Sequence, residues 1–170
     1  MASGALTEWN GPRRRRIKLI WDFRDQAPLP WQERQADMLL VMRMAAEFQG
    51  FARDLHDEAA EFLTLGATSG NQALARVLRV GIAAGRALNS RNATSGTLAA
   101  DFSRIGMIFW PAIKTQDPVS GPIWEADLNN LVEMRNAIAH DDRAKILKLE
   151  QNGFRLERAL TKRWHDTLDS

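Results

Sequence analysis

The sequence predicts an all-α fold, an up-and-down bundle of four main helices with a short addition on its C-terminal side. Apolar residues recur at helical spacing in residues 31–65, and shorter stripes of the same kind follow in 71–89, 97–110 and 122–140. The chain has 170 residues, of which 45% are hydrophobic and 26% charged. This composition excludes wholesale disorder, and the length favours one domain. We expect three segments, an N-terminal arm (1–30), the bundle (31–143) and a C-terminal addition (144–170).

The arm is basic and contains tryptophan. Residues 1–30 hold six basic and three acidic residues, a net charge of +3, whereas the other 140 residues carry a net charge of −1. Arg13, Arg14, Arg15 and Arg16 stand between Trp9 and Trp21. Arginines can bind RNA phosphates and tryptophans can stack on bases, so this run is a candidate RNA-binding element. The alternative is a solvated arm or a docking strand, because residues 17–23 are rich in apolar side chains.

The strongest periodic signal is in the first predicted helix. Eight apolar residues follow one another at spacings of 3,4,3,4,3,4,3, which is a heptad stripe. They are Met38, Val41, Ala45, Phe48, Ala52, Leu55, Ala59 and Phe62. A helix with such a stripe has to pack against other helices, so the stripe is expected to be core.

The remaining elements follow from turn signals and stripes. A glycine-rich turn separates the first helix from a second over 71–89, and a third over 97–110 is expected to stop at Pro111. A fourth runs from about Pro122 to His140. Gln151-Asn152-Gly153 between two apolar-rich stretches predicts a small hairpin or extended segment over 144–158. A last amphipathic helix follows from Leu160, and its pattern is cut short at Ser170, as in a truncated chain.

Several function classes are excluded. The chain has no cysteine, which removes disulfides, thiolate metal sites and a cysteine nucleophile. No apolar run approaches the roughly 18 residues of a membrane span, and residues 1–10 do not resemble a signal peptide, so a cytoplasmic location is expected. Asp141 and Asp142 are adjacent and diverge, so neither a metal site nor a cofactor is expected. His56 and His165 are interpreted as surface residues.

One constellation in the fourth helix can carry chemistry. Arg135 lies on the apolar stripe between Leu131 and Ile138, where a guanidinium requires an anionic partner. Beside it run Asn136 and His140, so a cation, an amide and an imidazole share one sector near the end of a helix.

The hexapeptide Arg135-Asn136-Ala137-Ile138-Ala139-His140 resembles the signature of HEPN domains, which is Arg, a polar residue, three spacers and His. The chain is most similar to bacterial HEPN proteins of the RiboL-PSP type, and residues 46–58 of the long helix also look like theirs. The resemblance covers about residues 31–140 and leaves out the arm and the tail. It implies a HEPN-like bundle with metal-independent endoribonuclease activity.

In that activity the 2′-hydroxyl of the RNA is the nucleophile, His140 exchanges protons, Arg135 stabilises the phosphate, and Asn136 orients the imidazole or binds a phosphate oxygen. Five residues of an ideal helix turn about 500°, so Arg135 and His140 point about 140° apart. The family pairs motifs across a two-fold axis, which implies a homodimer with a composite site.

The partners that follow are RNA, a second copy of the chain and, for a toxin or defence effector, a cognate inhibitor or antitoxin. The alternative is a non-catalytic HEPN-like bundle that binds RNA or a partner protein. In a further alternative, Arg135 and His140 are structural residues whose polar groups are paired inside the bundle, with the histidine capping a helix C-terminus. The same motif would then be present without activity.

Overall fold

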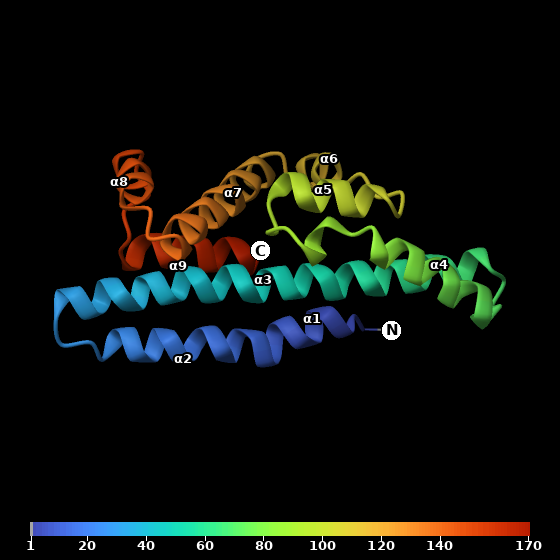
Figure 1. Cartoon of the computed structure of the whole chain (residues 1–170), viewed down its shortest axis with the longest axis horizontal. Helices are drawn as coiled ribbons and strands as arrows, with labels where there is room; N and C mark the ends of the chain where they lie inside the picture. Colours follow the sequence, from blue (N-terminus) through green and yellow to red (C-terminus); the bar gives the residue numbers. More distant parts are fainter. Residues whose placement is uncertain (1) are drawn as a thin grey trace.

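The computed structural model describes residues 2–170 and confirms the all-α class. One long helix, α3 (Pro30–Ala67), is the spine of the molecule (Figure 1). Along one side of it lie α1 (Gly4–Glu8), a π-helical turn (Trp9–Arg13) and α2 (Arg14–Asp25). α4 (Gln72–Ala84) packs on the C-terminal part of α3 and runs back along it. None of the helices in residues 2–170 has the length and apolarity that a membrane span needs.

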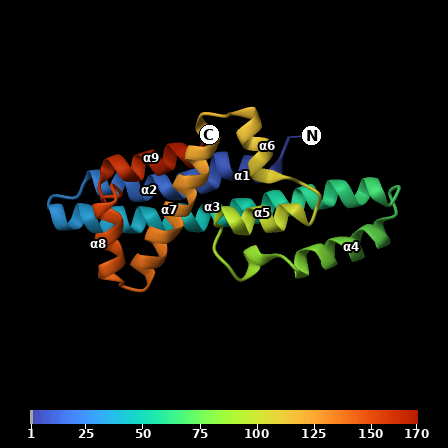
Figure 2. The same ribbon diagram turned by 90° about the horizontal axis from the view of Figure 1, so that it is seen from above.

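The other helices cover the opposite side of α3. A 3₁₀ turn (Ala87–Asn89) leads to α5 (Ser95–Ser103), α6 (Phe109–Gln116) and α7 (Ser120–Ala139), and α7 crosses α3 obliquely (Figure 2). α8 (Arg143–Gln151) and α9 (Arg158–Leu168) complete the fold, and α9 packs on both α3 and α7. The prediction of four main helices is not confirmed, because α2 is a further long helix and the expected third helix is two short ones.

Local sequence explains most helix boundaries. Pro30 occupies the first turn of α3, where its missing N–H costs nothing. Asn71, Thr94 and Asp142 each accept a hydrogen bond from the backbone N–H three residues on, and so cap α4, α5 and α8. The expected helix over 97–110 is wrong, since Gly106 with φ +78° breaks it. Pro111 then stands in the first turn of α6 instead of ending a helix.

The N-terminal segment is neither a solvated arm nor a strand. Trp9 and Ile17 are buried in the same hydrophobic cluster as Leu40 of α3 and Trp164 of α9. The indole Nε1 of Trp9 donates a hydrogen bond to Asp169 Oδ1 at 3.0 Å. Burial of apolar surface therefore makes residues 4–25 helical despite the consecutive arginines. The three expected segments share one core.

The predicted hairpin over 144–158 is also wrong. Residues 143–151 form α8, and Asn152-Gly153 ends that helix. Gly153 has φ +93°, its N–H donates to Glu150 O, and Phe154 N–H donates to Leu149 O. These two bonds are a Schellman motif, which needs glycine for the same reason as a hairpin turn does. The predicted last helix around Leu160 is confirmed as α9.

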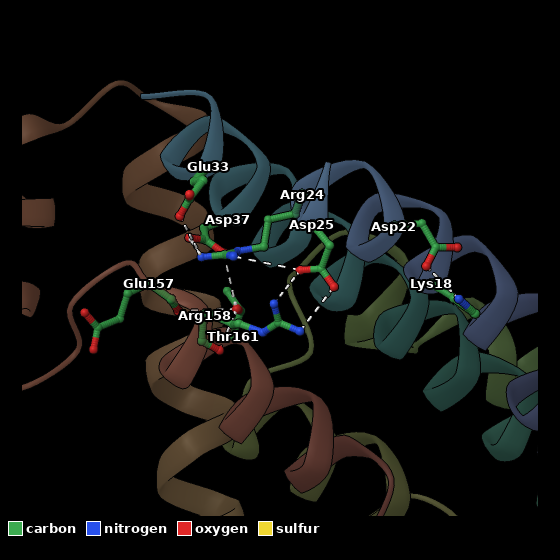
Figure 3. A network of polar contacts seen from close by, with 9 residues as sticks. All are labelled: Lys18, Asp22, Arg24, Asp25, Glu33, Asp37, Glu157, Arg158 and Thr161. Atoms are coloured by element: carbon green, nitrogen blue, oxygen red, sulfur yellow. Dashed lines mark hydrogen bonds and ion pairs between the residues drawn. The ribbon is translucent and has the colours of Figure 1, made fainter. Parts of the chain in front are cut away.

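The interior of α3 is more polar than its heptad stripe suggests. Asp37, Glu47 and His56 are buried on this helix because it is covered on two sides, whereas Phe62 at the end of the stripe is 80% exposed. His56 is fully buried, and its Nε2 lies 3.2 Å from Asp101 O, which corrects its assignment to the surface. Arg24 binds Asp37 at 2.9 Å, so an arginine compensates that buried carboxylate (Figure 3).

Candidate functional site

The candidate site lies where α7 ends. His140 is the C-cap residue of α7, and Asp141 follows with φ +49°, an unusual conformation for a residue other than glycine. Asp141 N–H donates to Ile138 O at 3.2 Å, and Asp142 N–H donates to Ala137 O at 2.8 Å. This second Schellman motif stops the helix at His140 and leaves the imidazole exposed on the surface.

Asn136 is the centre of a small polar network. Its Oδ1 accepts a hydrogen bond from Asn92 Nδ2 at 2.7 Å and another from Arg135 Nη1 at 3.1 Å. Asn92 belongs to the loop between the 3₁₀ turn and α5. The network therefore joins the motif helix to that loop and holds the Arg135 guanidinium beside the amide.

A second asparagine on α7 fixes the same loop. Asn129 lies seven residues, two helical turns, before Asn136, and its Oδ1 accepts the backbone N–H of Ser95 at 3.0 Å. Its Nδ2 donates to Ser95 Oγ at 2.9 Å. Asn129 and Asn136 together position residues 92–95 along one face of α7.

Arg135 is half-buried, and its partner differs from the expected one. Among residues 2–170, no carboxylate lies within 4.0 Å of its guanidinium, and its one side-chain partner is the neutral amide of Asn136. An amide oxygen satisfies a donor and leaves the positive charge unneutralised. The expectation of an anionic partner is therefore not met within the described part of this single chain.

Arg135 and His140 share no hydrogen bond in the described structure. The side chain of Arg135 turns to Asn136 and the loop at Asn92, whereas His140 stands at the open end of the helix. The structure thus brings Arg135 and Asn136 into contact with each other, and within residues 2–170 it does not join the side chain of His140 to either of them by a hydrogen bond.

The four N-terminal arginines have different surroundings. Arg13 and Arg16 bind the buried carboxylate of Glu47 at 2.9 and 2.6 Å, and Arg13 also binds Asp54. Burial by itself raises the pKa of Glu47, but hydrogen bonds from Arg16 and Arg13 lower it on balance.

The other two arginines face away from Glu47. Arg14 makes a bidentate pair with Asp169, with Nε at 2.8 Å and Nη2 at 2.7 Å from its oxygens. Arg15 is exposed and has no carboxylate within 4.0 Å among residues 2–170. Only Arg15 thus keeps an unneutralised charge.

The sequence did not indicate Asn92 as part of the site. It lies more than 40 residues before the motif in a polar loop, and nothing in its local pattern distinguishes it from Asn89. No group of three or more potential metal-ligating side chains occurs in residues 2–170. No protein-family model, curated protein or solved structure matches the chain.

Proposed function

We propose that the chain is a metal-independent endoribonuclease whose reaction centre is formed by Arg135, Asn136 and His140. The observation that carries the proposal is the amide-bound guanidinium of Arg135, whose charge is unneutralised within the described chain, on the same helix end as an exposed histidine. A phosphodiester is an anion that such a guanidinium can bind with two parallel hydrogen bonds. The resemblance to HEPN domains supports the same residues.

The reaction needs two proton transfers and one charged transition state. The 2′-oxygen forms a bond to phosphorus, the bond from phosphorus to the 5′-oxygen breaks, and the products are a 2′,3′-cyclic phosphate and a 5′-hydroxyl. A base removes the 2′ proton and an acid gives a proton to the leaving 5′-oxygen. Histidine ionises near neutral pH and can do either, while Arg135 stabilises the additional negative charge on the phosphate.

A homodimer would supply the second proton-transfer group. One chain offers one His140, and the Arg135 side chain of that chain turns to Asn136 and the Asn92 loop. Two copies related by a two-fold axis near the end of α7 would bring two histidines and two arginines to one phosphate. We propose this composite site, and a role as a toxin or defence effector acting on cytoplasmic RNA under a cognate inhibitor or antitoxin.

The decisive experiment incubates the purified protein with 5′-labelled single-stranded RNA in EDTA. We expect cleavage to fragments ending in 2′,3′-cyclic phosphate, and none with an Arg135→Ala, His140→Ala double variant. Lys148→Ala, which removes an exposed cation of α8, is the matched control and should cleave normally. Activity that requires added divalent metal, or that persists in the double variant, would refute the proposal.

Mixing singly inactive chains tests the composite site separately. Arg135→Ala chains mixed with His140→Ala chains should regain part of the activity, because each mixed dimer retains one Arg and one His from different chains. Native mass spectrometry first verifies that the chains exchange. A monomer that is fully active at micromolar concentration would contradict the two-fold site and leave the cleavage chemistry in place.

A non-catalytic bundle is the second candidate, and one observation favours it. Asn136 holds Asn92 while Asn129 holds Ser95, so the motif amide also has a structural use. Under this alternative the wild-type protein binds RNA or a partner protein and leaves labelled RNA intact in EDTA and in Mg²⁺. The same incubation therefore decides between the two candidates.

A further inference from the structure

A groove is lined mainly by residues of α2 and α9, two helices that both pack against α3. Its volume is about 610 Å³, within the usual range of small-molecule sites. α2 and α9 lie across α3 from the C-terminal end of α7 (Figure 2), and the groove lining does not include Arg135, Asn136 or His140, so the groove is distinct from the candidate reaction centre. The side chains that matter are Arg14, Arg15, Lys18, Trp21, Arg158 and His165.

Two bidentate ion pairs hold the walls of the groove together. Arg158 Nη1 and Nη2 donate to the two carboxylate oxygens of Asp25 at 2.6 and 3.1 Å (Figure 3). Arg14 binds Asp169 in the same way. The α2 members of these pairs are 11 residues apart, or about 16 Å along the helix. The groove is thus built on two helices fixed to each other at two points.

The wall near Asp25 carries a stacking pair. The guanidinium carbon of Arg158 lies 5.8 Å from the ring centroid of Trp21, and the same guanidinium is bound to Asp25. Nucleobases stack on tryptophan rings and on arginine planes. The pair therefore offers a flat, partly apolar surface that is suited to a base.

The middle of the groove carries the charge that an anion needs. Arg15 is exposed without a carboxylate within 4.0 Å in the described chain. Lys18 is bound only to Asp22, in an exposed i,i+4 pair of little strength. The groove lining contains four arginine or lysine side chains and three aspartates, and His165 adds a ring nitrogen donor. An anionic ligand therefore meets a net positive surface.

We propose that this groove binds a nucleoside phosphate, with the phosphate on Arg15 and Lys18 and the base against Trp21 and Arg158. Two sources share this chemistry, a free mononucleotide and one unit of a single-stranded RNA. The site is defined by binding and does not depend on cleavage by His140. The sequence predicts that all four arginines of residues 13–16 bind RNA. In the proposed site, Arg15 is the one arginine of this run that contacts the phosphate. Lys18, Trp21 and Arg158 supply the other contacts.

The test uses the full chain and probes that cannot be cleaved. One probe is a labelled 2′-O-methyl decaribonucleotide, measured by fluorescence anisotropy at several salt concentrations, and the other is AMP, measured by calorimetry. The variant is Arg15→Gln, Lys18→Gln. Its matched control is Arg76→Gln, Lys148→Gln, because these are also one exposed arginine and one exposed lysine on helices away from the groove. Deleting residues 1–16 would not test the groove, because the deletion also removes the buried side chain of Trp9 from the core.

We expect the groove variant to bind at least one probe about 10-fold more weakly or worse, and the control to bind as the wild type does. For the oligonucleotide, the slope of log affinity against log salt should flatten by about 0.7, because the proposed site neutralises one phosphate of a single strand. If the groove variant loses binding of the oligonucleotide only, the natural ligand is a single-stranded RNA. If it also loses binding of AMP, the groove accepts a free mononucleotide as well. Equal losses in both variants, or no binding of either probe to the wild type, would overturn the proposal.

Discussion

The arginine run 13–16 and the hexapeptide 135–140 both look functional in the sequence, but the structure gives their arginines different partners. Arg13 and Arg16 surround the buried carboxylate of Glu47, which neutralises them. Arg135 is held by the amide of Asn136, which does not. An arginine bound to a buried carboxylate is needed to compensate that charge, whereas one positioned by a neutral group keeps its charge for a ligand.

The largest effect that this contrast predicts is on cleavage. His140→Ala should lower the rate of RNA cleavage about 10²–10⁴-fold, the usual effect of removing a positioned acid or base. Because His140 is exposed at a helix end, the melting temperature should stay close to that of the wild type. Initial rates on labelled RNA, with circular dichroism as the folding control, measure both. An undiminished rate would place His140 outside the reaction.

In the arginine cluster the expected effect is on stability. Glu47→Gln should reduce the free energy of unfolding by about 3–5 kcal/mol, because it leaves Arg13, Arg16 and Arg43 without their shared buried carboxylate. Asp54→Asn removes an exposed partner of Arg13 and should cost less than about 1 kcal/mol. Urea titration measures both variants. Similar small losses would mean that Glu47 does not organise the cluster.

A double-mutant cycle sharpens the interpretation of Asn136. Asn92→Ala and Asn136→Ala should each cost about 1 kcal/mol, and the double variant should cost less than the sum, because both remove the bond between Asn92 Nδ2 and Asn136 Oδ1. Strict additivity in urea titrations would show that this bond contributes nothing. If Asn136→Ala also loses cleavage and Asn92→Ala does not, the amide acts beyond fixing the loop.

The smallest effect comes from acidification. Burial, and next the charge of Arg86, lower the pKa of His56 from 6.5, so the folded state resists a proton that the unfolded state accepts. Stability should be complete above pH 6.5 and decline as the pH falls below it. The pKa of Glu47 is lowered from 4.5, so its cluster weakens only below that pH. The free energy of unfolding, measured at pH 7.5 and 5.5, tests His56 alone, because the Glu47 cluster does not weaken in this range. The control is His56→Leu, whose stability should change less between these two pH values.

Much of the fold could be predicted from periodicity. The all-α class, α3 and α9 follow from apolar spacing, since a helix that buries one face must repeat its apolar residues at that interval. Residues 4–25 could not be predicted, because their helices depend on Trp9 and Ile17 packing against α3 and α9. The Asn152-Gly153 pair was misinterpreted because a positive φ suits both a hairpin and a helix end.

The site was predictable in part. Arg135, Asn136 and His140 lie within one and a half turns of α7, so the sequence alone places them near the same helix end, with Arg135 and His140 pointing in different directions. The hydrogen bond from Asn92 joins residues 44 positions apart, and the buried Glu47 joins arginines more than 30 positions earlier. Such contacts depend on which helices meet, and this tertiary information is not contained in a local pattern.

The contact between Trp9 and Asp169 has a consequence for folding during synthesis. It joins residues 160 positions apart, so the side of Trp9 that faces Asp169 stays uncovered until α9 has been made. Until then, Trp9 can pack on Phe48 and Phe51 of α3, but the part of the cluster that α9 covers is available to chaperones or to neighbouring chains. Contacts at such long separation also slow the final step. A nascent chain would therefore complete the core around Trp9 late, although Trp9 leaves the ribosome long before α9 does.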